Sequence, residues 1–320
     1  MNTAMSRRVL VPLLLVLGLG LALAPPAAQA QKPDKIKITC IPIAESLPLW
    51  TTIHKKFLDA ERIELELTKM GGGAVIFPAL TSGSIDLGCG NLISFVFAKD
   101  KGFPFQIVVP GSFFNTKPPY GNAIMVRTDG DIKAPQDLIG KRLGINTFGG
   151  LAEFYVRHAL TKAGVDPNKV QLTEVPFPQM PPLLLNKQVD AAYTPEPFLT
   201  LLQDGGKAKI LLSPDAEGEG GAVGIIVAEE KWIAAHRDLV TRFVRAYRKG
   251  MAYTNENQQE ARTEILPKFT ALTPELAAKI AISTFKPQIT QRELQLAVNL
   301  VKERLTNKTP DTSKWVLNVE

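Results

Sequence analysis

Apolar and polar positions follow two spacings that alternate along the chain. Apolar residues at every second position predict strands over residues 35–43 and 62–70, and a spacing of three to four predicts a helix over residues 46–60. A short helix over 74–82 and a strand over 85–90 continue the series. Alternating strands and helices are typical of a parallel sheet with helices on both faces.

The same alternation is repeated in the rest of the chain. We expect further strands over residues 104–113, 120–130, 137–146, 170–177, 189–194 and 208–214, and further helices over 92–102, 147–165, 179–188 and 196–206. The Gly-rich segment 215–224 favours a mobile connection. An extended run over 224–233 then precedes helices over 231–253, 273–284 and 290–305. The pattern therefore predicts two α/β units in succession.

Two crossings between these units are expected, near residues 113–122 and 219–228. They divide the chain into lobe I, residues 31–116 and 224–320, and lobe II, residues 117–223. Two lobes joined by a hinge enclose a cleft that closes on a ligand. In sheets of this kind, ligands bind at the carboxyl ends of the strands.

The first 30 residues have the pattern of an export signal. A basic start with Arg7 and Arg8 precedes a long apolar run, and the segment ends in the small-residue pattern Ala28-Gln29-Ala30. We expect cleavage after Ala30 and a mature protein in the periplasm. A retained membrane anchor is the alternative, although the apolar run is near the lower length limit for spanning a bilayer.

Charge and cysteine content exclude several classes of protein. The net charge of +6 is spread along the chain without a block of like charges, so nucleic-acid binding is not indicated. The two cysteines, Cys40 and Cys89, exclude metal sites built from repeated Cys-x-x-Cys pairs. Each follows a strand-like run, and an exported protein permits a disulfide between them. Two buried thiols are the alternative.

Four segments resemble a known family: 71–88, with a glycine run and then Ile85-Asp86; 137–150; 156–170; and 181–198. In order and spacing they are similar to the periplasmic solute-binding proteins of ABC importers, of the nitrate, sulfonate and taurine type that includes thiamine-pyrimidine (NMT1-like) binders. The chain departs from the family pattern in two places. No glycine precedes Val189-Asp190-Ala191, and residues 146–150 replace a Ser-rich turn.

The resemblance implies an α/β protein of the two-lobed periplasmic binding type (type II), with hinge-linked parallel-sheet lobes and a central cleft. It implies a transport protein that captures a small organic anion or zwitterion, either sulfonate- or taurine-like or an aromatic acid. A thiamine-pyrimidine or another N-heterocycle is the alternative solute. The implied partners are that solute and the membrane permease of an ABC importer, and we expect a monomer without a cofactor or metal.

Two glycine turns are the first candidates for contact with the solute. Residues Gly72, Gly73 and Ala74 begin one predicted helix, and Thr147, Phe148, Gly149 and Gly150 precede another. Glycine lets a ligand approach the backbone, and unpaired N–H groups with the positive end of the helix dipole bind oxyanions. Such turns therefore suit a sulfonate or carboxylate. Two ordinary strand-to-helix turns are the alternative.

The remaining candidates for ligand binding follow predicted strands. They are Glu45, Ser46, Trp50, Asn91 and Glu196. A carboxylate at Glu196 would repel a bare anion but would bind a solute with an amine or N–H group; alternatively, Glu196 is a first-turn acid stabilised by its helix. Aromatic residues near the gap could stack on a flat ligand or belong to the core.

An enzyme is the rival class. A pyrimidine synthase is related to the family, but this chain lacks the Cys-rich run of that enzyme. The histidines His54, His158 and His236 lie on separate predicted helices, and no GxSxG, HExxH or P-loop pattern is present. We therefore expect a binding protein with no catalytic residues.

Overall fold

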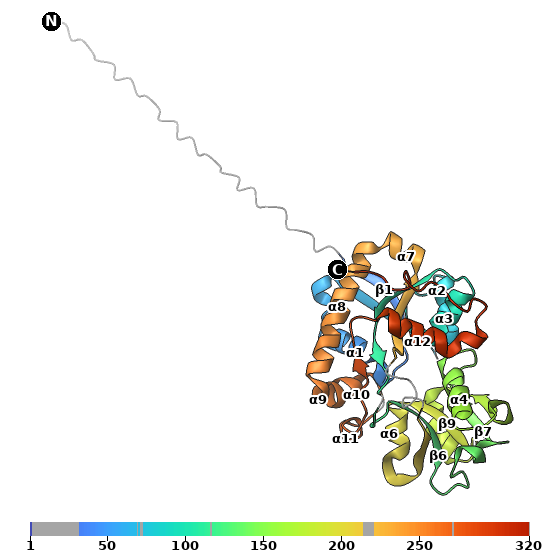
Figure 1. Cartoon of the computed structure of the whole chain (residues 1–320). Helices are drawn as coiled ribbons and strands as arrows, with labels where there is room; N and C mark the ends of the chain where they lie inside the picture. The colour runs from blue at the N-terminus through green and yellow to red at the C-terminus, as the bar shows by residue number, and fades with distance from the viewer. Residues whose placement is uncertain are drawn as a thin grey trace. The chain divides into compact units, whose positions relative to one another are not determined.

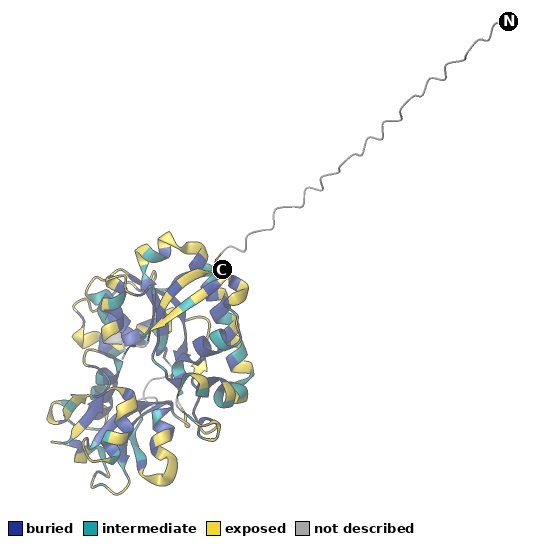
Figure 2. Cartoon of the chain, turned by 180° about the vertical axis from the view of Figure 1, so that it is seen from behind, coloured by how far each residue is buried: buried dark blue, intermediate teal, exposed yellow. Residues whose placement is uncertain are grey.

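The computed structural model describes Met1 and residues 32–68, 70, 73–115, 117–213, 221–270 and 272–319. The predicted signal segment and Gly72 lie outside these residues. The described fold contains two five-stranded sheets with helices packed around them, and buried residues fill the sheets and the inner helix faces (Figures 1 and 2). None of the described helices is long and apolar enough to cross a membrane.

The first sheet has the order β2-β1-β3-β11-β4. Its strands are β1 (Asp34–Thr39), β2 (Ile63–Thr68), β3 (Leu87–Asn91), β4 (Phe105–Pro110) and β11 (Gly224–Glu229). The second sheet has the order β10-β6-β9-β7-β8. Its strands are β6 (Asn122–Arg127), β7 (Arg142–Ile145), β8 (Gln171–Glu174), β9 (Ala191–Pro195) and β10 (Ala208–Leu212). The expected mixed α/β architecture is confirmed.

One strand in each sheet departs from the expected parallel arrangement. In the first sheet β11 is antiparallel to β3 and β4, and in the second β6 is antiparallel to β9 and β10. These are the strands by which the chain enters each sheet after a crossing. A crossing strand begins at the edge where its neighbours end, so it runs in the opposite direction. The first residues of β6 and β11 therefore lie beside the carboxyl ends of the other strands.

Helices cover both sheets. Around the first sheet lie α1 (Leu47–His54), α2 (Gly73–Thr81), α3 (Leu92–Asp100), α7 (Glu230–Ala235), α8 (Arg237–Glu256), α9 (Gln258–Glu260), α10 (Leu266–Phe269), α11 (Pro274–Ala277) and α12 (Gln291–Val301). Around the second lie α4 (Leu151–Lys162), α5 (Met180–Leu185) and α6 (Phe198–Gln203). The short strands β5 (Ser112–Phe113) and β12 (Thr284–Phe285) pair with each other.

Several helices are shorter than the hydrophobic spacing predicts. The chain leaves α1 at Lys55, and the next residue, Lys56, has a φ of 56°. The expected helix over 231–253 is divided at His236, whose φ of −125° is not helical. The expected stops are present, because Gly83 and Gly164 have φ values of 70° and 76°. That left-handed conformation costs glycine little.

The cysteines are joined in a disulfide. Strand β1 pairs with β3 in parallel, so Cys40 and Cys89 follow neighbouring positions at the same edge of the sheet. Their Cα atoms are 4.8 Å apart. The bridge links the carboxyl end of β1 to that of β3. The alternative of two free thiols does not hold in this structure.

The two crossings lie side by side. Phe113 forms a bridge with Ala222, and the Val223 N–H donates to the Ser112 carbonyl at 2.8 Å. The Phe114 N–H donates to the Gly221 carbonyl at 3.1 Å. The described parts of both connections therefore form one two-stranded link between the sheets.

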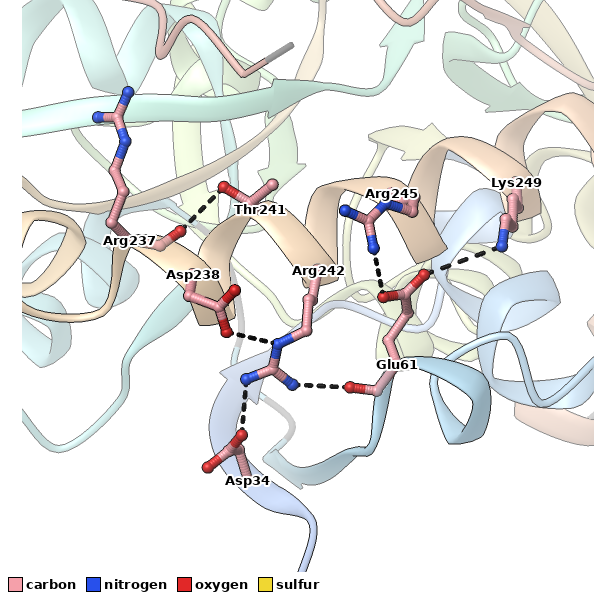
Figure 3. Close-up of polar contacts among 8 residues, drawn as sticks. All are labelled: Asp34, Glu61, Arg237, Asp238, Thr241, Arg242, Arg245 and Lys249. Atoms are coloured by element: carbon pink, nitrogen blue, oxygen red, sulfur yellow. Dashed lines mark hydrogen bonds and ion pairs between the residues drawn. The ribbon is translucent and has the colours of Figure 1, made fainter.

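An ion-pair network fastens the long helix α8 to the start of the first sheet (Figure 3). The Arg242 guanidinium donates to Asp34 at 2.6 Å, to Asp238 at 2.7 Å and to the Glu61 carbonyl at 2.7 Å. The buried Glu61 carboxylate in turn accepts from Arg245 at 2.8 Å. Arg242 thereby joins three separate segments of the chain.

Candidate functional site

A cavity of about 80 Å³ lies where the carboxyl ends of the two sheets face each other. The first sheet contributes the loop after β1, the end of β3 and the start of β11. The second contributes the start of β6, the end of β9, the loop after β7 and the first turn of α4. Its polar side chains are Glu45, Ser46, Asn91, Asn122, Asn146, Thr147, Tyr193 and Tyr247. Its larger apolar side chains include Ile41, Ile43, Leu49, Leu151, Phe177 and Ile225.

A chain of three polar side chains crosses the cavity. Tyr193 on β9 donates its hydroxyl to Asn122 Oδ1 at 3.1 Å, and Asn122 Nδ2 donates to Glu45 Oε1 at 2.8 Å. The Glu45 carboxylate only accepts when it is ionised, so it identifies the NH₂ of Asn122 and leaves the amide oxygen for the Tyr193 hydroxyl. The amide NH₂ therefore faces Glu45, and the Glu45 carboxylate is the acceptor at the end of the chain.

Glu45 has an unusual electrostatic environment. Burial raises the pKa of its carboxyl to about 7, and the hydrogen bond from Asn122 opposes this rise. A neutral amide compensates a buried negative charge only in part. Among the described residues that line the cavity, none is Arg, Lys or His. The carboxyl group therefore titrates near neutral pH.

The loop that carries Glu45 is held rigidly. The Ser46 hydroxyl donates to the Ile41 carbonyl at 3.0 Å, and the Ala44 N–H donates to the Glu196 carbonyl at 3.0 Å. Trp50 is 1% exposed and stacks on Phe269, with ring centroids 4.7 Å apart. Ser46 thus lines the cavity, and Trp50 supports the loop from the core behind it.

The first glycine turn leads into α2, which begins at Gly73. The side chains of residues 71–74 lie outside the described part of the chain, so contact of Gly72, Gly73 and Ala74 with the solute stays a prediction. Asn91, at the end of β3, lines the cavity. Its Oδ1 accepts from the Ser94 N–H at 2.8 Å and so caps α3. Asn91 therefore has the turn-finishing role that the sequence left open, in a position beside the solute space.

The second glycine turn is already occupied by the chain's own acids. The Gly149 N–H donates to Glu153 Oε2 at 2.8 Å, and the Phe148 N–H donates to Glu174 Oε2 at 3.2 Å. Thr147 is 7% exposed and lines the cavity, but the Phe148 side chain is 44% exposed and does not. Gly150 is the N-cap residue of α4 and also lies outside the lining. Carboxylates at both N–H groups make this turn a poor oxyanion site.

Glu196 does not line the cavity, and its carboxylate is fully engaged elsewhere. It accepts from the Thr200 N–H at 3.0 Å, from the Thr200 hydroxyl at 2.7 Å and from the Ala281 N–H at 3.1 Å. Burial raises the pKa of this carboxyl to about 7, and the three hydrogen bonds oppose the rise. Of the two sequence hypotheses, the structure shows the acid at the start of a helix, α6. It also links the two sheets, since Ala281 belongs to the first-sheet side.

The sequence did not single out Asn122, Tyr193, Phe177 or Tyr247, which line the cavity; Asn146, which also lines it, begins the loop 146–150 that the sequence did indicate. Asn122 had a detectable signal, because it is a polar residue at the start of the strand that follows the first crossing. Tyr193 had none, since it lies within an apolar strand. Of the aromatic residues near the predicted gap, Phe113 and Phe114 are buried at the crossing, in agreement with the core alternative that the sequence left open.

The three histidines lie outside the described lining of the cavity. His54 lies beside Lys268, His158 stacks on Phe154 and His236 stacks on Trp232. Within the described parts of the chain, no group of three or more His, Cys, Asp or Glu side chains could hold a metal ion.

Comparison with known proteins identifies relatives. Residues 44–261 match the model of a family described as NMT1/THI5 like. The taurine-binding periplasmic protein of Escherichia coli (strain K12) is 24% identical over 180 residues, 56% of this chain and 53% of that protein. The riboflavin-binding protein RibY of Chloroflexus aurantiacus is 26% identical over 241 residues, 74% of this chain and 67% of that protein. The chain thus aligns with only about half the length of the first.

Solved structures share the fold. The ligand-binding component of an ABC-type import system from Staphylococcus aureus has a TM-score of 0.74 and 22% sequence identity, over 89% of this chain and 96% of that one. At this identity the likeness concerns the fold alone. It agrees with the overall fold described above.

Proposed function

Because the chain belongs to the NMT1/THI5-like family, we propose that it is the solute-binding component of an ABC importer. One observation carries this proposal: a cavity at the carboxyl ends of two sheets, lined from both sides and spanned by a two-stranded link. Small-molecule sites in proteins of this architecture are expected there. The protein would bind its solute without chemical change.

The proposed mechanism is hinge closure. Residues 31–116 and 224–320 would move as one lobe, and residues 117–223 as the other, about the paired crossings. Contacts across the cavity, such as Asn122 to Glu45, would form as the lobes close on the solute. The closed form would then dock on a membrane permease as a monomer. The protein would act in the periplasm after cleavage behind Ala30.

Membership of the family does not identify the solute. The relatives are named for taurine and riboflavin, which differ in size and charge. The sequence-based expectation of a small organic anion or zwitterion stays a prediction, and so does the N-heterocycle alternative. The choice depends on the side chains of the cavity itself.

Thermal unfolding with a solute panel tests the binding role. The panel contains taurine, alkanesulfonates, nitrate, aromatic sulfonates and carboxylates, aliphatic and aromatic amines, and aminopyrimidines. A solute at about 100 times its dissociation constant stabilises the protein by about 2.7 kcal/mol. Asn122→Ala should weaken this response, whereas the exposed Asn299→Ala should not. A panel compound that the protein converts into a product would contradict the proposal.

A further inference from the structure

We infer that the solute binds through a cationic or N–H-bearing nitrogen held against Glu45, and that anions lacking such a group are excluded. This inference rests on the proposed function, since it assigns the solute class of the same cavity. It concerns the charge that the solute must carry and the residue that selects it.

The first argument is the charge of the cavity. Among the described lining residues, the ionisable side chains other than Glu45 are Tyr193 and Tyr247. Burial raises the pKa of Tyr247 further above its ordinary value, so that residue stays neutral. Glu45 is therefore the source of net charge on the described walls, and it is negative when ionised. An anion that entered would lie beside this carboxylate with no described cation to offset the repulsion.

The second argument is the vacant acceptor capacity of Glu45. Among the described residues, Asn122 is the one that donates to the carboxylate, and it donates to Oε1. A carboxylate has two oxygens and about four acceptor positions. Glu45 lines the cavity, and as a whole residue it keeps partial exposure although its carboxyl is desolvated. The acceptor positions of the carboxylate that Asn122 does not use are therefore open to a solute in the cavity. A hydrogen-bond donor on the solute would occupy them.

The third argument concerns the alternative anchor for an anion. In the turn before α4, Glu153 already accepts from the Gly149 N–H and Glu174 from the Phe148 N–H. An anion that bound these two N–H groups would have to displace those carboxylates. The cavity walls also carry the amides of Asn91 and Asn146 and the hydroxyl of Thr147. These suit neutral polar groups as well as they suit charged ones.

The apolar walls complete the description of the solute. Ile43, Leu151 and Phe177 line the cavity. They would contact a hydrocarbon or aromatic portion of the solute. The structure thus favours a compact molecule with an apolar body and a nitrogen donor, such as an amine, an amidine or an N–H heterocycle.

The test compares the full mature protein with its Glu45→Gln variant over the panel described above. The amine and heterocycle probes should stabilise the wild type. Their affinity for Glu45→Gln should fall by about 30-fold or more, since the variant loses the charged partner of a buried contact. Glu303→Gln, at an exposed position, is the matched control and should bind as the wild type does. Circular dichroism confirms that both variants fold.

A pH profile separates a direct contact from a structural role. The affinity of a cationic probe for the wild type should fall about tenfold per pH unit below pH 7, because Glu45 must lose its proton to bind it. In Glu45→Gln this dependence should disappear. An equal pH dependence in both proteins would show that Glu45 does not touch the probe.

The outcomes distinguish this inference from the proposed function. If isethionate, ethanesulfonate or nitrate stabilises the wild type, the inference is overturned while the binding role stands. If those anions stabilise Glu45→Gln but not the wild type, the exclusion of anions by the charge of Glu45 is supported. If no compound of any charge class stabilises either protein, the binding role itself fails, and the inference fails with it.

Discussion

Glu196 gives the sharpest prediction about how the two halves of the molecule are held together. Its carboxylate is 3% exposed and accepts three hydrogen bonds, two from Thr200 on α6 and one from the Ala281 N–H on the first-sheet side. Glu196→Ala leaves two backbone N–H donors without their acceptor. Each such donor costs about 1–3 kcal/mol when buried. We expect the variant to lose about 2–6 kcal/mol of unfolding free energy.

The pH dependence of a second variant, Glu196→Gln, tests the buried state of the acid. The carboxyl pKa is about 7 in the folded protein, against an ordinary value of 4.5. The folded state therefore binds more protons than the unfolded state between these values, so this group makes stability fall as pH rises from 4.5 to 7. The full difference corresponds to about 3 kcal/mol. Glutamine does not titrate and lacks this contribution.

Urea unfolding of the wild type and Glu196→Gln at pH 5, 6, 7 and 8 measures the effect. Subtraction removes the contributions of other groups, including Glu45, because both proteins share them. The wild type should lose stability relative to the variant as pH rises to 7, and the difference should then level off. A difference that stays constant from pH 5 to pH 8 would refute the reasoning, as would a cost below about 0.5 kcal/mol for Glu196→Ala.

Three further predictions concern the framework around the cavity. Gly250→Ala should destabilise the protein by about 1–3 kcal/mol in urea titrations, because the added Cβ would overlap the facing turn of α1; a neutral effect would show that α1 and α8 separate easily. The double variant Cys40→Ser/Cys89→Ser should lose about 4 kcal/mol of unfolding free energy, since the bridge closes a loop of 49 residues. A reductant should lower the melting temperature of the wild type and leave that of the double variant unchanged. Arg242→Ala should lower the unfolding free energy more than Arg245→Ala does, because Arg242 joins three segments and Arg245 is half-exposed. Equal losses would contradict the role of the network.

The architecture was largely predictable from hydrophobic spacing, because a buried strand and an amphipathic helix leave distinct local patterns. The direction of two strands was not predictable in this way. Residues 122–127 and 224–229 have the composition of the neighbouring strands, and their antiparallel orientation follows from where the chain crosses. Helix ends were also missed. The break at His236 depends on its backbone conformation, which no spacing of apolar residues reveals.

Only the site residues that follow the ends of strands could be predicted from the sequence. Glu45, Ser46, Asn91 and Thr147 were expected from the carboxyl-end rule and line the cavity. The Tyr193 hydroxyl comes from within a strand, and its contact with Asn122 joins residues 71 positions apart. Nothing local identifies such a pair.

The two acids Glu45 and Glu196 show why the solute class needed the structure. Both come after strands near the cavity, and in both desolvation raises the carboxyl pKa to about 7. Glu196 meets the first N–H groups of α6 and the Ala281 N–H, so its charge is used within the protein. Glu45 meets a single amide and faces the cavity, so its charge remains for a ligand. Sequence places two acids at the cleft, but only the distribution of donors shows which one a solute must satisfy. Because that one is Glu45, the partner it lacks has to arrive with the solute.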